Sequence, residues 1–344
     1  MVNLENIKKR FPNRVVTIDS HTAGEPTRLI VNGIPPVPGK TMQAKLDYFR
    51  EHFDYLRLQL TCEPRGHRGI FGAFLTEPVS HEAAFGLIYM DPRRYPFLCG
   101  HATIGAVTTL IEAGVIKPDL NHKETKVCVD TPSGMMHTKA LVKDGKVQSV
   151  AIKTVPSFVY KTDESLEIPG LGRIKADTVC VGGFFAMVSA DQIDLELKPE
   201  NSNLLIQYGM DIIDAANQQL KVRHPTRPEV RTVDVVEFYD SSQHDRGQGQ
   251  NVVVFGEGHI DRSPCGTGTA AKLTLMHHKG QIAVNQPFIN ASPLGTVFNA
   301  RIVAETQVGD LPAIEAEIRG SAYITGLHEF VCDSSDPFPK GFLL

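Results

Sequence analysis

Two short stretches of the sequence place a cysteine, a glycine and a threonine in the same order. Residues 99–103 read CGHAT, and residues 265–269 read CGTGT. Their cysteines lie 166 positions apart in a chain of 344 residues. A motif that recurs at about half the chain length suggests two similar lobes, each of which presents one thiol.

A helical pattern of apolar residues follows each motif: Ile104, Val107, Leu110 and Ile111 after the first, and Ala270, Leu273 and Met276 after the second. Each thiol is therefore expected at a helix N-terminus, where unpaired N–H groups favour negative charge. That position lowers the pKa of a thiol and makes the thiolate available near neutral pH. The same N–H groups can hold a carboxylate, and the glycine after each cysteine allows close approach. We predict a thiol base beside an anion site, formed twice.

Two matched thiols suit a reaction that removes a proton from one side of a carbon and returns one to the other side. The thiolate would be the base, the thiol the acid, and the planar carbanion between them could invert. The proton would lie α to a carboxylate, whose oxygens the two helix N-termini would bind. Asp261, four residues before Cys265, is a candidate for binding a substrate ammonium group. It fits equally well as a turn residue in the sequence Asp-Arg-Ser-Pro.

Other uses of cysteine and histidine explain less of the sequence. Cys99 and His101 have a poor spacing for zinc, and no second pair repeats it, so no metal site is predicted. A Cys–His nucleophile is the next alternative, but it would leave Cys265 idle. Four further histidines are predicted to be structural, the last two as partners of a helix C-terminus: His21, His67, His277 and His278.

The composition is typical of a soluble globular protein, with 42% hydrophobic and 22% charged residues and a net charge of −4. No long basic run indicates nucleic acid or an anionic membrane surface as a partner. The first ten residues lack the apolar core of a secretory signal and no stretch is long enough to span a bilayer, so a cytoplasmic location is expected. The six cysteines have no Cys-x-x-Cys pair, which predicts free thiols. Four of them are predicted to be packing or structural residues: Cys62, Cys128, Cys180 and Cys332.

Hydrophobic periodicity predicts an α/β protein with many strands and few helices. Helices are predicted at residues 41–60, from the first cysteine motif to about 114, at 204–219 and after the second motif. Polar loops are predicted at 19–27, 63–69 and 241–250. Strand runs and hairpin signals such as Asp144-Gly145 favour mostly antiparallel sheet. The pattern restarts at Pro156, and no glycine-rich nucleotide motif indicates a cofactor.

Five stretches together resemble the proline racemase family: 19–25 (DSHTAGE), 63–67 (EPRGH), 99–101 (CGH), 261–269 (DRSPCGTGT) and 320–326 (GSAYITG). They span nearly the whole chain. The resemblance implies a cofactor-free fold like that of diaminopimelate epimerase, with two pseudo-symmetric lobes of mostly antiparallel sheet around central helices. It also implies a substrate between the lobes and a homodimer. The first lobe would comprise residues 14–155 with a returning segment at about 321–344, and the second residues 156–320.

The resemblance assigns roles to individual residues. It makes Cys99 and Cys265 the two acid/base thiols and Asp261 the partner of the ring nitrogen. The substrate carboxylate and neighbouring groups would be held by Gly100, His101, Gly266 and Thr267. Three residues match positions that are aromatic in proline racemases, namely Phe71, Phe185 and Phe255, and Val235 stands where hydroxyproline epimerases tend to have histidine. Because an apolar wall leaves a buried hydroxyl unpartnered, at a cost of about 1–3 kcal/mol, we expect proline as substrate.

Substrate and outcome have alternatives within the family and outside it. Many trans-3-hydroxyproline dehydratases replace one cysteine, so the presence of both favours racemisation or epimerisation. Ala102 replaces a usual glycine, and Arg93-Arg94 lies in a segment that is glycine-rich in the family. The alternatives are a 4-hydroxyproline 2-epimerase, a trans-3-hydroxy-L-proline dehydratase, and a small-ligand binding module of the same fold with idle thiols.

Overall fold

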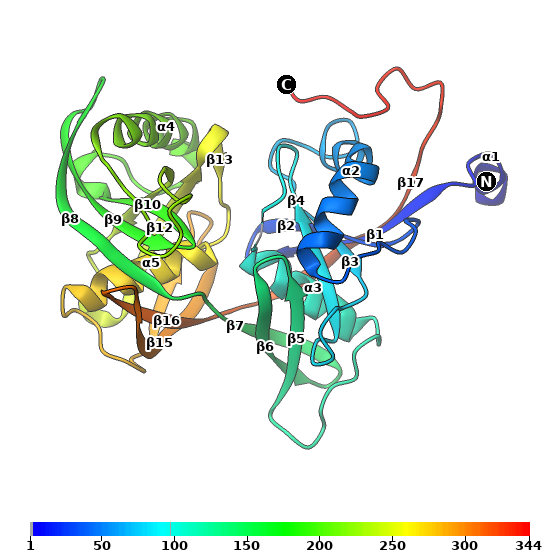
Figure 1. Cartoon of the computed structure of the whole chain (residues 1–344), viewed down its shortest axis with the longest axis horizontal. Coiled ribbons are helices and arrows are strands. Elements are labelled where there is room, and N and C mark those ends of the chain that lie inside the picture. Colours follow the sequence, from blue (N-terminus) through cyan, green and yellow to red (C-terminus); the bar gives the residue numbers. More distant parts are fainter. Residues whose placement is uncertain (1–2, 97) are drawn as a thin grey trace. The chain divides into compact units, whose positions relative to one another are not determined.

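The computed structural model describes residues 3–96 and 98–344. The backbone forms two compact units, one of residues up to 150 together with 321–344, and the other of residues 151–320 (Figure 1). The predicted mixed α/β fold, rich in strands and with few helices, is confirmed. The lobe limits of 14–155 and 156–320 stay a prediction. Within residues 3–96 and 98–344, no helix is both long and apolar enough to cross a membrane.

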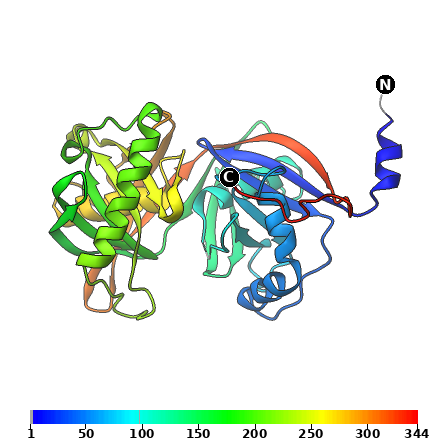
Figure 2. The same ribbon diagram turned by 90° about the horizontal axis from the view of Figure 1, so that it is seen from above.

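The first unit contains a sheet in the order β17–β1–β2–β3–β4–β5–β6. The strands are β1 (Arg14–Thr22), β2 (Glu25–Asn32), β3 (Gly72–Thr76), β4 (Phe85–Met90), β5 (Glu124–Thr131), β6 (Gly134–Lys143) and β17 (Ala322–Val331). Only the pairs β2–β3 and β4–β5 are parallel among these. Both views show the C-terminal strand β17 beside β1 (Figures 1 and 2). The first strand of the chain therefore pairs with the last.

Two helices pack on this sheet. Helix α3 (Gly100–Glu112) contacts β1, β2 and β17, and all of its residues from 102 to 111 are buried. A helix that is buried all round belongs to the interior of its unit. Helix α2 (Met42–Thr61) contacts β3 and β4 through an apolar cluster that includes Leu46 and Phe49. The sequence pattern predicted both helices, and both are confirmed.

The polar segment 19–27, predicted as a loop, is instead a β-hairpin. Strand β1 continues to Thr22 and β2 begins at Glu25, so the turn consists of Ala23 and Gly24 with φ angles of 49° and 102°. The prediction was wrong because polar side chains point inward here: Ser20, Thr22, Glu25 and Thr27 are buried. A strand whose buried positions are polar does not show the apolar alternation by which strands are recognised.

Other predicted boundaries need smaller corrections. Residues 4–10, for which no helix was predicted, form helix α1 (Leu4–Arg10), which has no buried residue. The predicted loop 241–250 is shorter, because β12 begins at Gln248. The Asp144-Gly145 turn joins β6 to β7 (Lys146–Lys153) with φ angles of 51° and 75°, which are the positive values expected of a tight hairpin turn.

The strands of the second unit pair in a closed ring, β8–β9–β10–β11–β12–β14–β15–β16 and back to β8. They are β8 (Ser157–Ile168), β9 (Gly172–Val181), β10 (Gly183–Ser189), β11 (Val233–Asp240), β12 (Gln248–Phe255), β14 (Phe288–Ala291), β15 (Val297–Val308) and β16 (Leu311–Gly320). Only β10–β11 and β12–β14 are parallel in this ring. The short strand β13 (His259–Ile260) pairs with β12. The prediction of mostly antiparallel sheet is confirmed.

Helix α5 (Gly266–His278) runs inside this ring, where it contacts β8, β9, β15 and β16, and its residues 268–276 are buried. Helix α4 (Ser202–Gln219) packs on β8, β11 and β12 from outside (Figures 1 and 2). The apolar cluster between α4 and the strands includes Phe158, Phe184 and Phe238, which are fully buried. Each unit therefore encloses one short helix that begins directly after a conspicuous cysteine.

Truncation of the second core should be costly. Phe158 is fully buried, with its ring centroid 5.3 Å from that of His224 and 6.3 Å from that of Phe184. We expect Phe158→Ala to lower the free energy of unfolding by about 3–5 kcal/mol, measured by urea denaturation. The same truncation at Phe338, which is 49% exposed, should cost less than about 1 kcal/mol. Equal losses would show that Phe158 does not belong to the core.

Candidate active site

Cys99 caps the N-terminus of α3. Its Sγ accepts a hydrogen bond from the N–H of Ala102 at 3.5 Å, and its backbone carbonyl accepts one from Thr103 Oγ1 at 2.7 Å. The threonine hydroxyl in turn lies 2.6 Å from the Tyr89 hydroxyl. Because Thr103 and Tyr89 are buried, their hydrogen bonds hold the backbone of Cys99 in place. The predicted position of this thiol at a helix N-terminus is confirmed.

His101 and Phe71 lie beside this thiol. The Nδ1 atom of His101 is 3.2 Å from the Cys99 sulfur, and its backbone carbonyl accepts a hydrogen bond from Thr22 Oγ1 at 2.8 Å. The Phe71 ring meets the imidazole edge-on, with centroids 4.9 Å apart at 73°. Gly100 is the first residue of α3. The first unit thus brings together Phe71, Cys99, Gly100 and His101, as the sequence predicts.

Cys265 caps the N-terminus of α5 in the same way. Its Sγ accepts a hydrogen bond from the N–H of Gly268 at 3.3 Å and lies 3.3 Å from Thr267 Oγ1. Gly266 and Thr267 are the first two residues of the helix. The φ angle of Cys265 is 57°, which lies in the left-handed region that a cysteine seldom adopts. Strain of this kind is concentrated at functional sites.

The ionisation of Cys265 differs from the sequence-based expectation. Burial raises the pKa of the Cys265 thiol well above its usual range, and the Asp261 carboxylate raises it further. The Thr267 hydroxyl and the Gly268 N–H act in the opposite direction. The prediction of a lowered pKa is therefore wrong for Cys265 in this conformation. The loss of hydration around a buried thiolate outweighs the stabilisation that a helix N-terminus gives.

Asp261 shapes the turn that precedes this cysteine. Its Oδ1 accepts hydrogen bonds from both the N–H and the Oγ of Ser263, each at 2.8 Å. The Ser263 hydroxyl then accepts one from the Cys265 N–H at 3.1 Å. Asp261 is 3% exposed, and its own N–H donates to the Val253 carbonyl. The interpretation of Asp261 as a turn residue is confirmed, and its carboxylate lies near enough to influence the thiol.

An apolar row crosses three adjacent strands of the second unit. Phe185 on β10 pairs with Val235 on β11, which pairs with Phe255 on β12. Directly paired residues lie on the same face of a sheet, as do residues two apart on one strand. Glu237 is therefore on this face, and its Oε2 is 2.9 Å from the position that a Cβ on Gly268 would occupy. The row thus shares the sheet face that the N-terminus of α5 covers.

A group of buried polar side chains that the sequence did not predict lies between α5 and the neighbouring strands: Glu237, Asn251, Lys272 and Asn290. Asn251 Nδ2 donates to Glu237 Oε1 at 2.9 Å, and Lys272 Nζ donates to Asn290 Oδ1 at 3.1 Å. Burial raises the pKa of Glu237 to about 8 and lowers that of Lys272 to about 8. The one available signal was a single charged residue in each of two apolar runs, 235–239 and 268–276. Such a residue can equally well face solvent, so the sequence alone did not show that Glu237 and Lys272 are buried.

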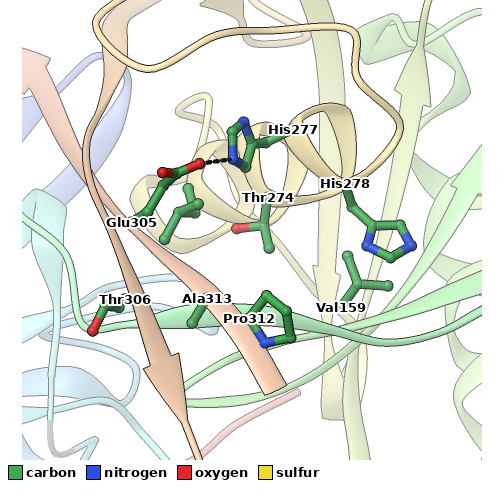
Figure 3. A pocket seen from close by; sticks show the side chains of 9 residues that line it. Val159, Thr274, His277, His278, Glu305, Thr306, Pro312 and Ala313 are labelled. Atoms are coloured by element: carbon green, nitrogen blue, oxygen red, sulfur yellow. Dashed lines mark hydrogen bonds and ion pairs between the residues drawn. The ribbon is translucent and has the colours of Figure 1, made fainter. Parts of the chain in front are cut away.

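The second unit has a pocket of about 120 Å³ at the other end of α5 (Figure 3). His277 and His278 line it from the helix C-terminus, as predicted for these histidines. The Nε2 atom of His277 is 3.0 Å from Glu305 Oε1, and its Nδ1 is 3.0 Å from the Ile282 carbonyl. His277 follows Cys265 by twelve residues, which corresponds to about 18 Å along a helix. The pocket therefore lies away from Cys265.

None of the six cysteines forms a disulfide, as predicted. Cys62 and Cys180 are buried, which confirms their packing role. Cys128 is half-buried beside His137 Nδ1 at 3.4 Å, and Cys332 is exposed, so neither is a core residue. Over residues 3–96 and 98–344, no three Cys, His, Asp or Glu side chains are grouped as they would be around a metal ion.

Comparison with known proteins identifies the family. The family model described as proline racemase matches residues 17–343. The chain belongs to the proline racemase family. A proline racemase of Clostridioides difficile is 44% identical over 335 residues, which cover 97% of this chain and 99% of that protein. A 4-hydroxyproline 2-epimerase of Streptosporangium roseum is 36% identical over 95% of this chain and 97% of its own length.

A solved structure of this family has the same fold. The probable proline racemase from Agrobacterium radiobacter, crystallised with bound carbonate, superposes with a TM-score of 0.86 at 32% identity and covers 96% of each chain. The resemblance to the proline racemase family that the motifs suggested is therefore confirmed, together with the fold class. The protein is an enzyme of this isomerase family.

The contacts of Cys265 predict how a neighbouring side chain alters its ionisation. Thr267→Val removes a hydroxyl that stabilises the thiolate, so the pKa of Cys265 should rise further, by about one unit. The pH dependence of Cys265 alkylation, followed by mass spectrometry of the peptide that contains it, measures this shift. Thr306→Val, at the pocket beyond the other end of α5, is the matched control and should leave the midpoint unchanged. A lower midpoint in Thr267→Val would contradict the assigned hydrogen bond.

Proposed function

We propose that this enzyme interconverts L- and D-proline without a cofactor, using Cys99 and Cys265 as its acid and base. The observation that carries the proposal is the repeated geometry of the two thiols. Each sulfur caps a buried helix and accepts the N–H of the residue three positions later, at 3.5 Å in one unit and 3.3 Å in the other. Each unit thus offers one thiol at a helix N-terminus, and a two-sided proton transfer needs two such groups.

In the proposed reaction, one sulfur acts as thiolate and removes the α-proton of proline. The C–H bond breaks, its electron pair moves toward the carboxylate, and a new S–H bond forms. The second sulfur, present as a thiol, then donates its proton to the opposite side of the planar carbon. After the reaction the two sulfurs have exchanged roles, so the same site accepts the other enantiomer. No oxidant, reductant or further reactant is needed.

The groups beside the thiols support recognition of an amino acid. The first-turn N–H groups at Gly100 and His101, and at Gly266 and Thr267, would bind the substrate carboxylate, because helix N-termini favour anions. Asp261 would pair with the ring ammonium, since it is a carboxylate four residues before Cys265 and close to that thiol. In this role the Asp261 carboxylate would accept hydrogen bonds both from Ser263 in its own turn and from the substrate ammonium.

The apolar surroundings favour proline over its hydroxylated forms. Phe185, Val235 and Phe255 form one row, and Phe71 packs on His101. A hydroxyl group buried against such side chains would lose its hydrogen bonds to water without replacement, at a cost of about 1–3 kcal/mol. The relative named proline racemase is also more similar to this chain than the one named 4-hydroxyproline 2-epimerase. The expected homodimer and cytoplasmic location stay predictions.

Removal of either sulfur tests the mechanism. Cys99→Ser and Cys265→Ser should each reduce racemisation of proline by a factor of at least about 100–10,000, because a serine hydroxyl is a far weaker acid. Chiral chromatography of D-proline formed from L-proline measures the loss. Cys332→Ser makes the same change at an exposed thiol and should keep wild-type turnover. Near-normal turnover in either of the first two variants would falsify the two-thiol mechanism.

The substrate is tested with proline, trans-4-hydroxyproline and trans-3-hydroxyproline in deuterium oxide. We expect deuterium at the α-carbon of proline, with turnover of the hydroxylated compounds lower by a factor of about 10 or more. Val235→His should shift this preference toward 4-hydroxyproline by supplying a hydrogen-bond partner, and the apolar variant Val235→Leu should not. Preferred turnover of a hydroxyproline, or loss of water from it, would indicate the epimerase or dehydratase instead. Absence of any exchange would indicate a binding module.

A further inference from the structure

The two thiols have different charged neighbours. The Cys99 sulfur lies 3.2 Å from the imidazole Nδ1 of His101, a group that can accept the thiol proton and then carry positive charge. Cys265 instead lies near the carboxyl groups of Asp261 and Glu237, and both raise the pKa of its thiol in addition to burial. The two half-sites therefore resemble each other in backbone geometry but differ in charge.

Glu237 lies directly beneath the first turn of α5. Its side chain is fully buried, its Oε1 accepts a hydrogen bond from Asn251, and its Oε2 has no hydrogen-bond partner within the described part of the chain. A Cβ built on Gly268 would be 2.9 Å from this Oε2 and 3.2 Å from the Cys265 Cβ. The carboxyl group and the cysteine are thus separated by little more than the glycine backbone. A glycine at position 268 makes this approach possible.

The other charged groups around Glu237 do not neutralise it by a direct contact. Lys272, one turn farther along α5, is buried and donates to the Gln250 carbonyl at 2.8 Å and to Asn290 Oδ1 at 3.1 Å. His244 lies near Lys272. Burial lowers the pKa of His244 to about 4, and the positive charge of Lys272 lowers it further. Its imidazole is therefore neutral near pH 7. A buried carboxyl oxygen without a hydrogen-bond partner lowers the stability of the fold. A carboxyl group at such a position therefore suggests a functional role.

The first unit has a different kind of polar contact under its helix. A Cβ built on Gly105 of α3 would lie 3.0 Å from Ser20 Oγ, 3.5 Å from Thr22 Oγ1 and 3.4 Å from Thr27 Oγ1. These side chains are buried hydroxyls, which carry no charge at any ordinary pH. In the second unit, the Glu237 carboxyl group approaches α5 at Gly268, which is three residues after Cys265, whereas Gly105 is six residues after Cys99. This difference separates the two half-sites electrostatically.

We propose that in the resting enzyme Cys265 holds the proton and Cys99 is the thiolate, and that Glu237 is a positioning residue that keeps Cys265 in its thiol form. The inference rests on the proposed two-thiol function. The proton of the Cys99 thiol passes to the His101 imidazole, which leaves a thiolate beside an imidazolium. A second negative charge at Cys265 is disfavoured, because the Asp261 carboxylate lies near it and the Glu237 carboxyl group ionises before Cys265 does. The free enzyme is thus set to remove a proton with Cys99 and to donate one from Cys265.

The sign of the effect of Glu237 follows from the order in which the groups ionise. The pKa of Glu237 is raised to about 8, and that of Cys265 lies well above its ordinary value of 9.0. Glu237 is therefore already ionised in the pH range in which Cys265 loses its proton. Replacing Glu237 by a neutral residue removes that negative charge and should lower the pKa of Cys265.

The test compares the ionisation of both thiols in one sample. Short iodoacetamide pulses label the protein from about pH 6 to about pH 12, because the Cys265 midpoint is expected well above 9.0. Mass spectrometry gives the labelling midpoint of each cysteine. Midpoints are compared because burial alters the rates of both. In the wild type, Cys99 should have the lower midpoint. Glu237→Gln, which keeps an oxygen acceptor for Asn251, should lower the Cys265 midpoint by at least about half a unit and leave Cys99 unchanged.

Glu305→Gln is the matched control, because it removes the same charge from the other end of α5, where Glu305 contacts His277. It should move neither midpoint. An unchanged Cys265 midpoint in Glu237→Gln, or a wild-type Cys99 midpoint at or above that of Cys265, overturns the inference. The wild-type comparison needs no variant, so it decides even if Glu237→Gln does not fold. Labelling requires no turnover, so failure of racemisation would reject the proposed function separately.

Discussion

A buried helix N-terminus must find acceptors for its first N–H groups, and much of this structure follows from that requirement. Helices α3 and α5 are both buried from their third residue onward, where water is scarce. In each, a cysteine sulfur occupies the capping position and accepts one of those N–H groups. Sulfur is a weak acceptor as a thiol and a much better one as a thiolate. The capping requirement therefore ties the fold of each unit to the ionisation of its cysteine.

Two opposing effects act on these sulfurs. The helix N-terminus favours the thiolate, and burial opposes it, because a charged sulfur loses its hydration. At Cys265, which is 3% exposed, burial dominates and nearby carboxyl groups act in the same direction. A thiol that is hard to ionise suits a proton donor better than a base. The same backbone motif can therefore produce an acid in one unit and a base in the other, according to the side chains packed beneath the helix.

The strands contribute more than a scaffold for the helices. In the second unit, the pairing of β10, β11 and β12 brings Phe185, Val235 and Phe255 into one row, although they are far apart in sequence. Two residues farther along β11, the same face carries Glu237. Along this face of β11, the side chains change from apolar Val235 to charged Glu237 at the point where the first turn of α5 packs on the strand. Strand register thus decides which residues lie near Cys265 and which lie under the body of the helix.

The sequence by itself determined the repeated cysteine motif, the helices that follow it, the strand-rich fold and the family. These depend on local patterns, namely apolar periodicity, glycine placement and short motifs, which a single chain displays directly. The sequence did not determine the hairpin at residues 19–27, because its buried positions are polar and lack the usual alternation. Nor did it determine the ionisation of Cys265 or the buried position of Glu237 beside Gly268. Both depend on which distant side chains are packed together away from water, and burial changes the energy of a charge far more than sequence neighbours do. Only the tertiary structure decided these.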